Sequence, residues 1–241
     1  MLPIYRPSIL DNCQYFDINM IYNSNTLNIF SDASMKKIKK KGNILSACYG
    51  AVALSEDHIV DEMIRVQSLC TVPAAELRGI RCSLYLALKY RNLYRVINIF
   101  SDSLYAITSI RDFAMDWIWD SKNEYYKYNK FHPKSSRPIQ NQELIYECIM
   151  LINELRKTNI INIFHQRGHI QSSDEMVIAK EAFKKYNGFT FEVSFNIIRY
   201  ISMYNNLIDE KTRNIIKYND FYSDNYIDPV VFKPNPNIYL N

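Results

Sequence analysis

The sequence predicts an α/β fold in which helices flank a five-stranded mixed sheet. Apolar segments of strand length, bounded by charged or turn-forming residues, occur five times, at residues 27–31, 46–54, 59–67, 95–101 and 160–164. The first three follow one another without an intervening helix, which predicts an antiparallel meander. Helical repeats separate the later segments, and this alternation predicts parallel strands.

Three helices are predicted between the strands. The first begins around Pro73, which the first turn of a helix tolerates, and its apolar positions recur at helical spacing: Leu77, Ile80, Leu84 and Leu88. Its basic residues fall between these positions, and we expect them on the solvent-facing side: Arg78, Arg81 and Lys89. A short helix is expected at residues 104–113 and a longer one at residues 140–157.

Composition and length indicate one globular domain with insertions. The 241 residues are 48% hydrophobic and 22% charged, which argues against global disorder. We expect the main domain at residues 26–216, an extension at residues 1–25 and a tail at residues 217–241. A net charge of +4 permits a nucleic-acid partner without proving one.

Cysteine spacing and the absence of long apolar runs indicate the compartment. The five cysteines are scattered without metal-binding spacing, which favours a reducing environment and no zinc site. No stretch approaches the roughly 20 apolar residues of a membrane span. We expect a monomeric cytoplasmic protein without membrane contact. The abundance of isoleucine, asparagine, lysine and tyrosine hints at A/T-rich codons and so at a phage, a virus or a low-GC bacterium. For a phage or viral protein, the expected location is the cytoplasm of the host.

Four carboxylates mark the candidate site. Asp32 and Asp102 each follow a strand that ends in Ile-Phe-Ser, Glu76 lies in the first turn of the first helix, and Asp209 lies in a late polar helix. Taken singly, Asp102 is explained as a helix N-cap and Glu76 as a residue favoured by the helix dipole. Together the acids are typical of a fold that gathers distant carboxylates around divalent ions for phosphodiester hydrolysis.

The order of these motifs resembles type 1 ribonuclease H. That family places an Asp at the end of its first strand, a Glu at the start of its first helix, an Asp-Ser pair after its fourth strand, a Gly-His step after its fifth and a late Asp on its last helix. The matching residues here are Asp32, Glu76, Asp102-Ser103, Gly168-His169 and Asp209, with Pro138 to Asn141 resembling the lead into the long helix. The resemblance spans roughly residues 26–215 and implies an RNase H-like catalytic domain.

The resemblance implies an activity and a metal requirement. It implies a two-metal endonuclease that cuts the RNA strand of an RNA/DNA hybrid with Mg²⁺ or Mn²⁺ and leaves 3′-hydroxyl and 5′-phosphate ends. Asp32 would bridge two ions, Glu76 and Asp102 would bind one of them, and Asp209 would bind the other. His169 would assist proton transfer or product release from a mobile loop. The implied duties are primer removal or hybrid clearance during replication.

The fourth acid leaves an alternative open. Asp209 is preferred because Asn205 and Arg213 around it resemble the family's last helix, whereas Asp174 looks like part of a helix cap. This choice places an inserted helical segment at about residues 172–204, with helices expected at 176–186 and 195–204. The insertion is either a lid beside the site or a purely structural hairpin.

Nucleic-acid contacts are expected around the acids and in the segment at residues 117–137, where basic and aromatic residues alternate. Such a surface can follow phosphates and stack on bases. The expected contact residues are Thr71, Ser34, Ser103, Trp117, Lys122, Lys127, Lys130, Lys134, Arg137 and Asn141. Val72 and Pro73 replace polar residues that usually read 2′-hydroxyl groups, so the preference for RNA stays open.

Two alternatives to this function remain. The same fold occurs in DNA-cutting integrases and junction resolvases, and a non-catalytic hybrid or duplex binder would keep the fold while losing acids. Proofreading exonucleases are disfavoured because they need a second acid where Ser34 stands. The complete acid set favours an enzyme over a binding protein.

Overall fold

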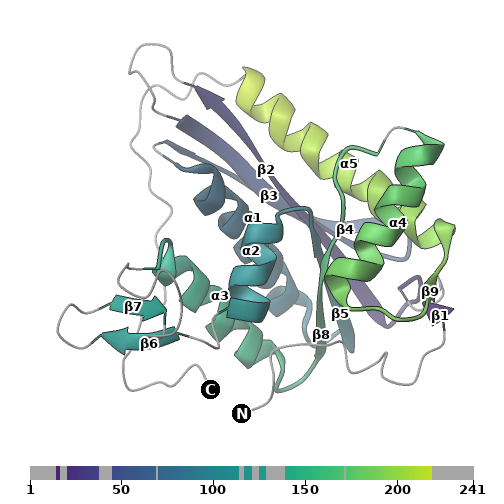
Figure 1. The fold of residues 1–241 in the computed structure, drawn as a ribbon, viewed down its shortest axis with the longest axis horizontal. Helices are drawn as coiled ribbons and strands as arrows, with labels where there is room; N and C mark the ends of the chain where they lie inside the picture. Colours follow the sequence, from purple (N-terminus) through teal and green to yellow (C-terminus); the bar gives the residue numbers. More distant parts are fainter. Residues whose placement is uncertain are drawn as a thin grey trace.

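A five-stranded mixed sheet with helices on both faces forms the body of the protein (Figure 1). The computed structural model describes residues 15–16, 21–37, 45–68, 70–113, 117–120, 125–128, 139–170 and 172–218. The strand order across the sheet is β4 (His58–Ser68), β3 (Leu45–Ser55), β2 (Thr26–Lys37), β5 (Val96–Ser101) and β8 (Ile160–His165). Neighbours among β4, β3 and β2 are antiparallel, whereas β2, β5 and β8 are parallel. The predicted RNase H-like architecture is confirmed.

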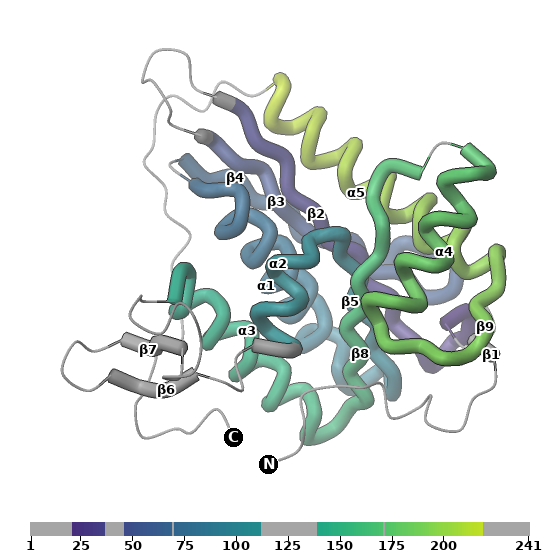
Figure 2. Tube along the Cα trace, in the orientation of Figure 1, coloured from purple at the N-terminus to yellow at the C-terminus, as the bar shows by residue number. Residues whose placement is uncertain are grey.

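Helices form the two outer layers. Those on one face are α1 (Val72–Tyr90), α2 (Leu104–Thr108), which continues as a π-helical turn over Ser109–Phe113, and α3 (Gln142–Leu155). Those on the other face are α4 (Ser173–Asn187) and α5 (Phe195–Tyr218). Figure 2 shows the same layers as a chain trace. Within the described parts of the chain, no helix has the length and apolar character needed to span a bilayer.

Two short sheets lie outside the main one. Strands β6 (Trp117–Asp120) and β7 (Tyr125–Tyr128) pair antiparallel, and β1 (Tyr15–Phe16) pairs parallel with β9 (Glu192–Val193). The second pairing ties the expected N-terminal extension to the connection between α4 and α5.

The repeated Asn-Ile-Phe triplets of the parallel strands explain the layered core. Successive side chains of a strand point to opposite faces, so the isoleucines Ile29 and Ile99 pack toward α1 and α3. The phenylalanines Phe30, Phe100 and Phe164 face α4 and α5, and their rings stack with centroid distances of 4.7 Å and 5.1 Å. The aligned triplets hold the ends of the three strands at one edge of the sheet.

The prediction that the arginines of α1 face solvent is wrong. Arg78 and Arg81 are only 6% and 1% exposed. The helix α3 covers this side of α1, and its buried Glu147 forms a 3.0 Å ion pair with Arg81. A charged residue that would otherwise interrupt a helix contact is thus accommodated by an opposite charge on the neighbouring helix.

The last two predicted helices are one continuous helix. The segment at residues 195–204, expected to be a separate inserted helix, forms the first part of α5, and Asp209 lies in the middle of this helix rather than near its start. Buried residues continue through both parts: Ile197, Ile201, Tyr204, Ile208 and Thr212. The apolar face of α4, with Ala179 and Phe183, joins the same core.

Candidate active site

Three of the four predicted acids meet at one edge of the sheet. Asp32 lies on β2, Asp102 directly follows β5, and Glu76 lies in the second turn of α1. One carboxylate oxygen from each can be chosen so that all three lie within 4.8 Å of one another. The carboxylates are close enough to share a bound cation.

The register of the parallel strands explains this meeting. Ser31 pairs with Ser101, so the residues that follow them, Asp32 within β2 and Asp102 after β5, lie side by side. The strand β2 does not end at Asp32, as the sequence predicted, because its antiparallel pairing with β3 continues to Lys37. The helix α1 approaches the same point closely at Gly79, where a Cβ atom would lie 3.2 Å from the Asp32 carbonyl oxygen.

Asp209 reaches the cluster from α5. Its proximity contributes to the raised pKa of both Asp32 and Asp102. Arg213, one helical turn later, forms an ion pair with Asp209. The competing residue Asp174 lies exposed in the first turn of α4, where Ser172 and Glu175 form a capping box.

Burial and mutual repulsion disfavour negative charge in the cluster. Burial, followed by the Asp102 charge, raises the pKa of Asp32 to about 8. Burial, followed by the charges of Asp32 and Asp102, raises the pKa of Glu76 to about 9. The pKa of Asp102 is also raised, mainly by burial. These acids are difficult to ionise together unless a cation neutralises them.

The donor set fits divalent metal ions. Among the described residues, no lysine or arginine forms an ion pair with Asp32, Glu76 or Asp102, and one buried carboxylate oxygen of Glu76, Oε2, has no hydrogen-bond partner. Carboxylate oxygens are the ligands that Mg²⁺ and Mn²⁺ prefer. A bound ion would satisfy both the excess negative charge and the unpartnered oxygen.

The predicted Gly-His step lies directly against the acids. A Cβ atom on Gly168 would lie 2.3 Å from Oδ2 of Asp102, so glycine leaves the space that this carboxylate occupies. His169 has a left-handed backbone with φ of 55°, and its side chain is 64% exposed. Its Nδ1 atom lies 3.7 Å from Oδ2 of Asp209. The loop thus presents an exposed imidazole beside the acid cluster.

His165, at the end of β8, has a different environment. Its Nε2 atom lies 3.2 Å from the carbonyl oxygen of Asp102, and its ring contacts Tyr186 edge to face. Burial lowers the pKa of His165 to about 4, which keeps the imidazole neutral at physiological pH. Its contacts support the strand end that carries Asp102.

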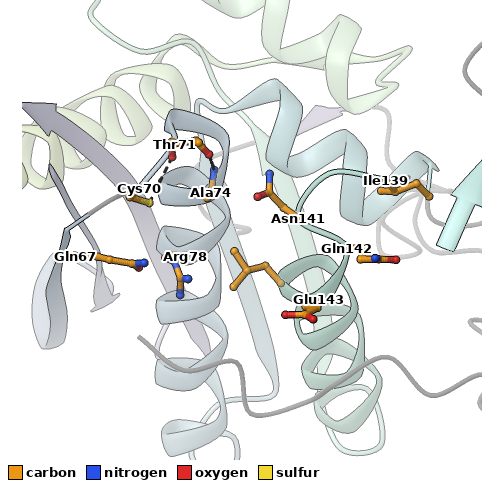
Figure 3. A pocket seen from close by; sticks show the side chains of 10 residues that line it. Gln67, Cys70, Thr71, Ala74, Arg78, Ile139, Asn141, Gln142 and Glu143 are labelled. Atoms are coloured by element: carbon orange, nitrogen blue, oxygen red, sulfur yellow. Dashed lines mark hydrogen bonds between the residues drawn. The ribbon is translucent and has the colours of Figure 1, made fainter. Parts of the chain in front are cut away.

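Two of the predicted nucleic-acid contacts line one cavity of about 410 Å³ (Figure 3). Thr71 caps α1 by accepting a hydrogen bond from the Ala74 amide, and Asn141 lies at the start of α3 with φ of 57°. The same cavity is lined by Arg78 and Gln67, which the sequence did not indicate. Arg78 was missed because its helical position predicts solvent exposure.

The remaining predicted contacts are not gathered in this cavity. The hydroxyl of Ser34 is 3.0 Å from that of Thr212 in the interface with α5, and Ser103 caps α2. Trp117 and Lys127 lie on β6 and β7, where only the backbone is described. The others lie outside the described residues: Lys122, Lys130, Lys134 and Arg137.

Solved structures of low sequence identity resemble the chain. RNase H1 from Halobacterium salinarum NRC-1 is 17% identical, with a TM-score of 0.39 over 66% of this chain and 93% of that one. The RNase H domain of prototype foamy virus is 16% identical, with a TM-score of 0.44 over 70% and 96%. A foamy viral protease-reverse transcriptase bound to an RNA/DNA hybrid is 16% identical, with a TM-score of 0.43 over 70% of this chain and 20% of the larger one.

The sequence itself identifies the family. A search of curated protein sequences found no significant match. The sequence model of the RNase H family, in contrast, matches residues 24–182, which include Asp32, Glu76 and Asp102 and end inside α4, before Asp209. The match covers well over half of the 241 residues, and therefore this chain belongs to the RNase H family and is a ribonuclease H.

Proposed function

We propose that this ribonuclease H hydrolyses the RNA strand of RNA/DNA hybrids and requires two divalent ions, Mg²⁺ or Mn²⁺. The observation that carries the proposal is the cluster of Asp32, Glu76 and Asp102, whose oxygens lie within 4.8 Å although burial and repulsion oppose their ionisation. Such a cluster is unfavourable in a metal-free protein and favourable around cations.

The acids divide the ligand positions as the family pattern implies. Asp32 would contact both ions, Glu76 and Asp102 would hold one, and Asp209 would hold the other. Divalent ions in such a site activate the attacking water and stabilise charge on the attacking and leaving oxygens. The contribution of the chain is to hold four carboxylates together despite their repulsion, and the sheet, α1 and α5 provide this rigidity.

His169 is proposed to move protons at the site. The imidazole is exposed to solvent, and its Nδ1 lies 3.7 Å from the Asp209 carboxylate. An exposed imidazole beside a carboxylate can accept a proton, hold it through the ion pair and release it to water. This geometry supports a role in protonating the leaving group or in releasing the product.

The cavity beside α1 is proposed to bind a backbone phosphate of the substrate. Thr71 supplies a hydroxyl group, Asn141 an amide and Arg78 a positive charge, a combination suited to phosphate oxygens. The cavity is lined by the N-terminal turns of α1 and α3, where the positive end of each helix dipole favours anions. Binding here would fix the position of the duplex relative to Glu76, which lies on α1 as well.

The direct test compares the wild type with Asp102→Asn on matched labelled RNA/DNA, RNA/RNA, single-stranded RNA and DNA/DNA substrates. Each reaction is run with Mg²⁺, with Mn²⁺ and with chelator. We expect metal-dependent cleavage of the RNA strand of the hybrid, leaving 5′-phosphate ends, and its loss in the variant.

Other outcomes assign other functions. Cleavage of DNA/DNA would place the chain with the DNA-cutting integrases and resolvases. Tight binding of the hybrid without cleavage by the wild type would indicate a non-catalytic binding protein. Confirmed hybrid cleavage would be consistent with removal of RNA primers or hybrids during replication.

A further inference from the structure

A buried chain of two side-chain amides ends on the Asp102 carboxylate. Asn205 on α5 and Gln166, directly after β8, are only 1% and 2% exposed. The Nε2 group of Gln166 donates to Oδ1 of Asn205, and the Asn205 side chain lies beside the Asp102 carboxylate, where it opposes the rise in the pKa of that group. Two elements that are distant in sequence thus converge on one acid of the candidate site.

The chemistry of a carboxylate determines which way the two side-chain amides are oriented. An ionised carboxylate only accepts hydrogen bonds, so Asn205 must turn its NH₂ group toward Asp102. Its carbonyl oxygen then faces Gln166 and requires a donor, which the Gln166 amide provides. If Gln166 could not donate, the Asn205 carbonyl would be buried without a partner and the orientation of the amide would lose its support.

The side-chain amide of Gln166 is only partly hydrogen-bonded in this arrangement. Its other amide atom, Oε1, is buried without a partner. A buried unpartnered carbonyl costs about 1–3 kcal/mol, and such groups are rare in native proteins. An apolar side chain of similar size would exchange this cost for that of an unpartnered Asn205 carbonyl, so a gain in stability does not explain a glutamine here.

The two amides complete an enclosure around Asp102. The Gln166 backbone amide donates to the Ser101 carbonyl at 3.0 Å, which fixes Gln166 beside the strand end that carries the acid. Gly168, which lacks a Cβ atom, lets the loop lie directly against the Asp102 carboxylate. Asn205 lies one helical turn before Asp209, so α5 contacts Asp102 and Asp32 from the same face.

We propose that Gln166 is a positioning residue for metal binding, which orients the Asn205 amide and through it holds the Asp102 carboxylate toward Asp32 and Glu76. The inference rests on the proposed function only in taking these acids as ligands of divalent ions. Hydrogen-bond partners of ligating carboxylates typically contribute 10–100-fold to metal affinity or activity.

The test measures Mn²⁺ binding to the substrate-free protein by calorimetry, for the wild type and for Gln166→Met, with Gln166→Leu as a second variant if the first does not fold. We expect Mn²⁺ affinity to fall about 10-fold or more. The metal-free melting temperature should stay close to that of the wild type, because one unpartnered buried carbonyl replaces another. On the hybrid, kcat should fall while KM stays within about twofold, because the substrate contacts are unchanged.

Asn159→Leu provides the matched control. Asn159 lies just before β8, as Gln166 lies just after it, and its buried amide donates to the Arg91 and Tyr94 carbonyls. This variant should lower the melting temperature and leave Mn²⁺ affinity unchanged.

A folded Gln166→Met or Gln166→Leu variant with wild-type Mn²⁺ affinity would overturn the proposal. If the wild type binds Mn²⁺ but leaves the hybrid intact, the proposed substrate is wrong, whereas the affinity difference still decides the role of Gln166. The two proposals are therefore separable.

Discussion

Arg81 of α1 and Glu147 of α3 form a 3.0 Å ion pair in which both side chains are almost completely buried. The hydroxyl of Tyr85 donates to the second oxygen of Glu147 at 2.6 Å. The pair joins the helix that carries Glu76 to the helix whose start carries Asn141. It therefore connects the acid cluster with the cavity proposed to bind phosphate.

We predict that Glu147→Gln lowers the free energy of unfolding by about 3–5 kcal/mol, because the Arg81 charge stays buried without its counter-charge. Urea unfolding followed by circular dichroism measures this change. The double variant Arg81→Met/Glu147→Leu should lower the free energy of unfolding by less than Glu147→Gln does, since it removes both charges. A loss below about 1 kcal/mol for Glu147→Gln would show that water or another group compensates the arginine.

The fourth acid can be assigned by paired substitutions. Asp209→Asn should reduce the rate of hybrid cleavage at least about 100-fold. Removing a hydrogen-bond partner of a metal ligand typically costs 10–100-fold, and removing the ligand itself should cost more. Asp174→Asn, on the exposed first turn of α4, should leave the rate within about twofold. Initial rates at saturating Mg²⁺ decide between them, and the opposite pattern would make Asp174 the fourth acid.

Metal-free stability should depend on pH through Glu76. Its pKa in the folded protein is about 9, far above that of an unfolded glutamate, so its stabilising contribution is complete below pH 4 and is lost as pH rises toward 9. Glu76→Gln should therefore raise the melting temperature in chelator more at pH 8.5 than at pH 5. Equal differences at both pH values would contradict the raised pKa.

Mg²⁺ should reverse this pH dependence in the wild type. Metal ligands bind in their ionised form, so the cation stabilises the state that repulsion disfavours. The increase in melting temperature on adding Mg²⁺ should be larger at pH 8.5 than at pH 5, and should be small in Glu76→Gln at either pH.

Gly168→Ala should impair catalysis more than stability. The added Cβ atom would lie 2.3 Å from Oδ2 of Asp102, so the carboxylate has to leave its position beside Asn205. We expect kcat to fall about 10–100-fold with little change in melting temperature. An unchanged kcat would show that the loop moves instead.

Gly188→Ala is a control that should affect stability and leave catalysis unchanged. Gly188 ends α4 with φ of 71°, and nothing lies within 4 Å of the position that an added Cβ atom would take. A left-handed alanine costs about 1–2 kcal/mol, so this variant should be less stable but fully active.

Local patterns in the sequence determined most of the fold and three acids of the site. The repeated Ile-Phe-Ser-Asp segments place Asp32 and Asp102 at equivalent positions of two similar segments, and the parallel pairing of these segments brings the two acids together. The helical repeat places Glu76 near the start of α1. These features are predictable because strand alternation and helical periodicity are properties of a few neighbouring residues.

Only the tertiary structure decided how distant segments complete the site. The place of Asp209 depends on α5 being one continuous helix packed on the sheet, and the burial of Arg78 and Arg81 depends on α3 lying against α1. The amide chain from Gln166 through Asn205 to Asp102 depends on where β8 ends relative to α5. Such contacts are set by packing between elements far apart in sequence, and no local pattern of residues encodes them.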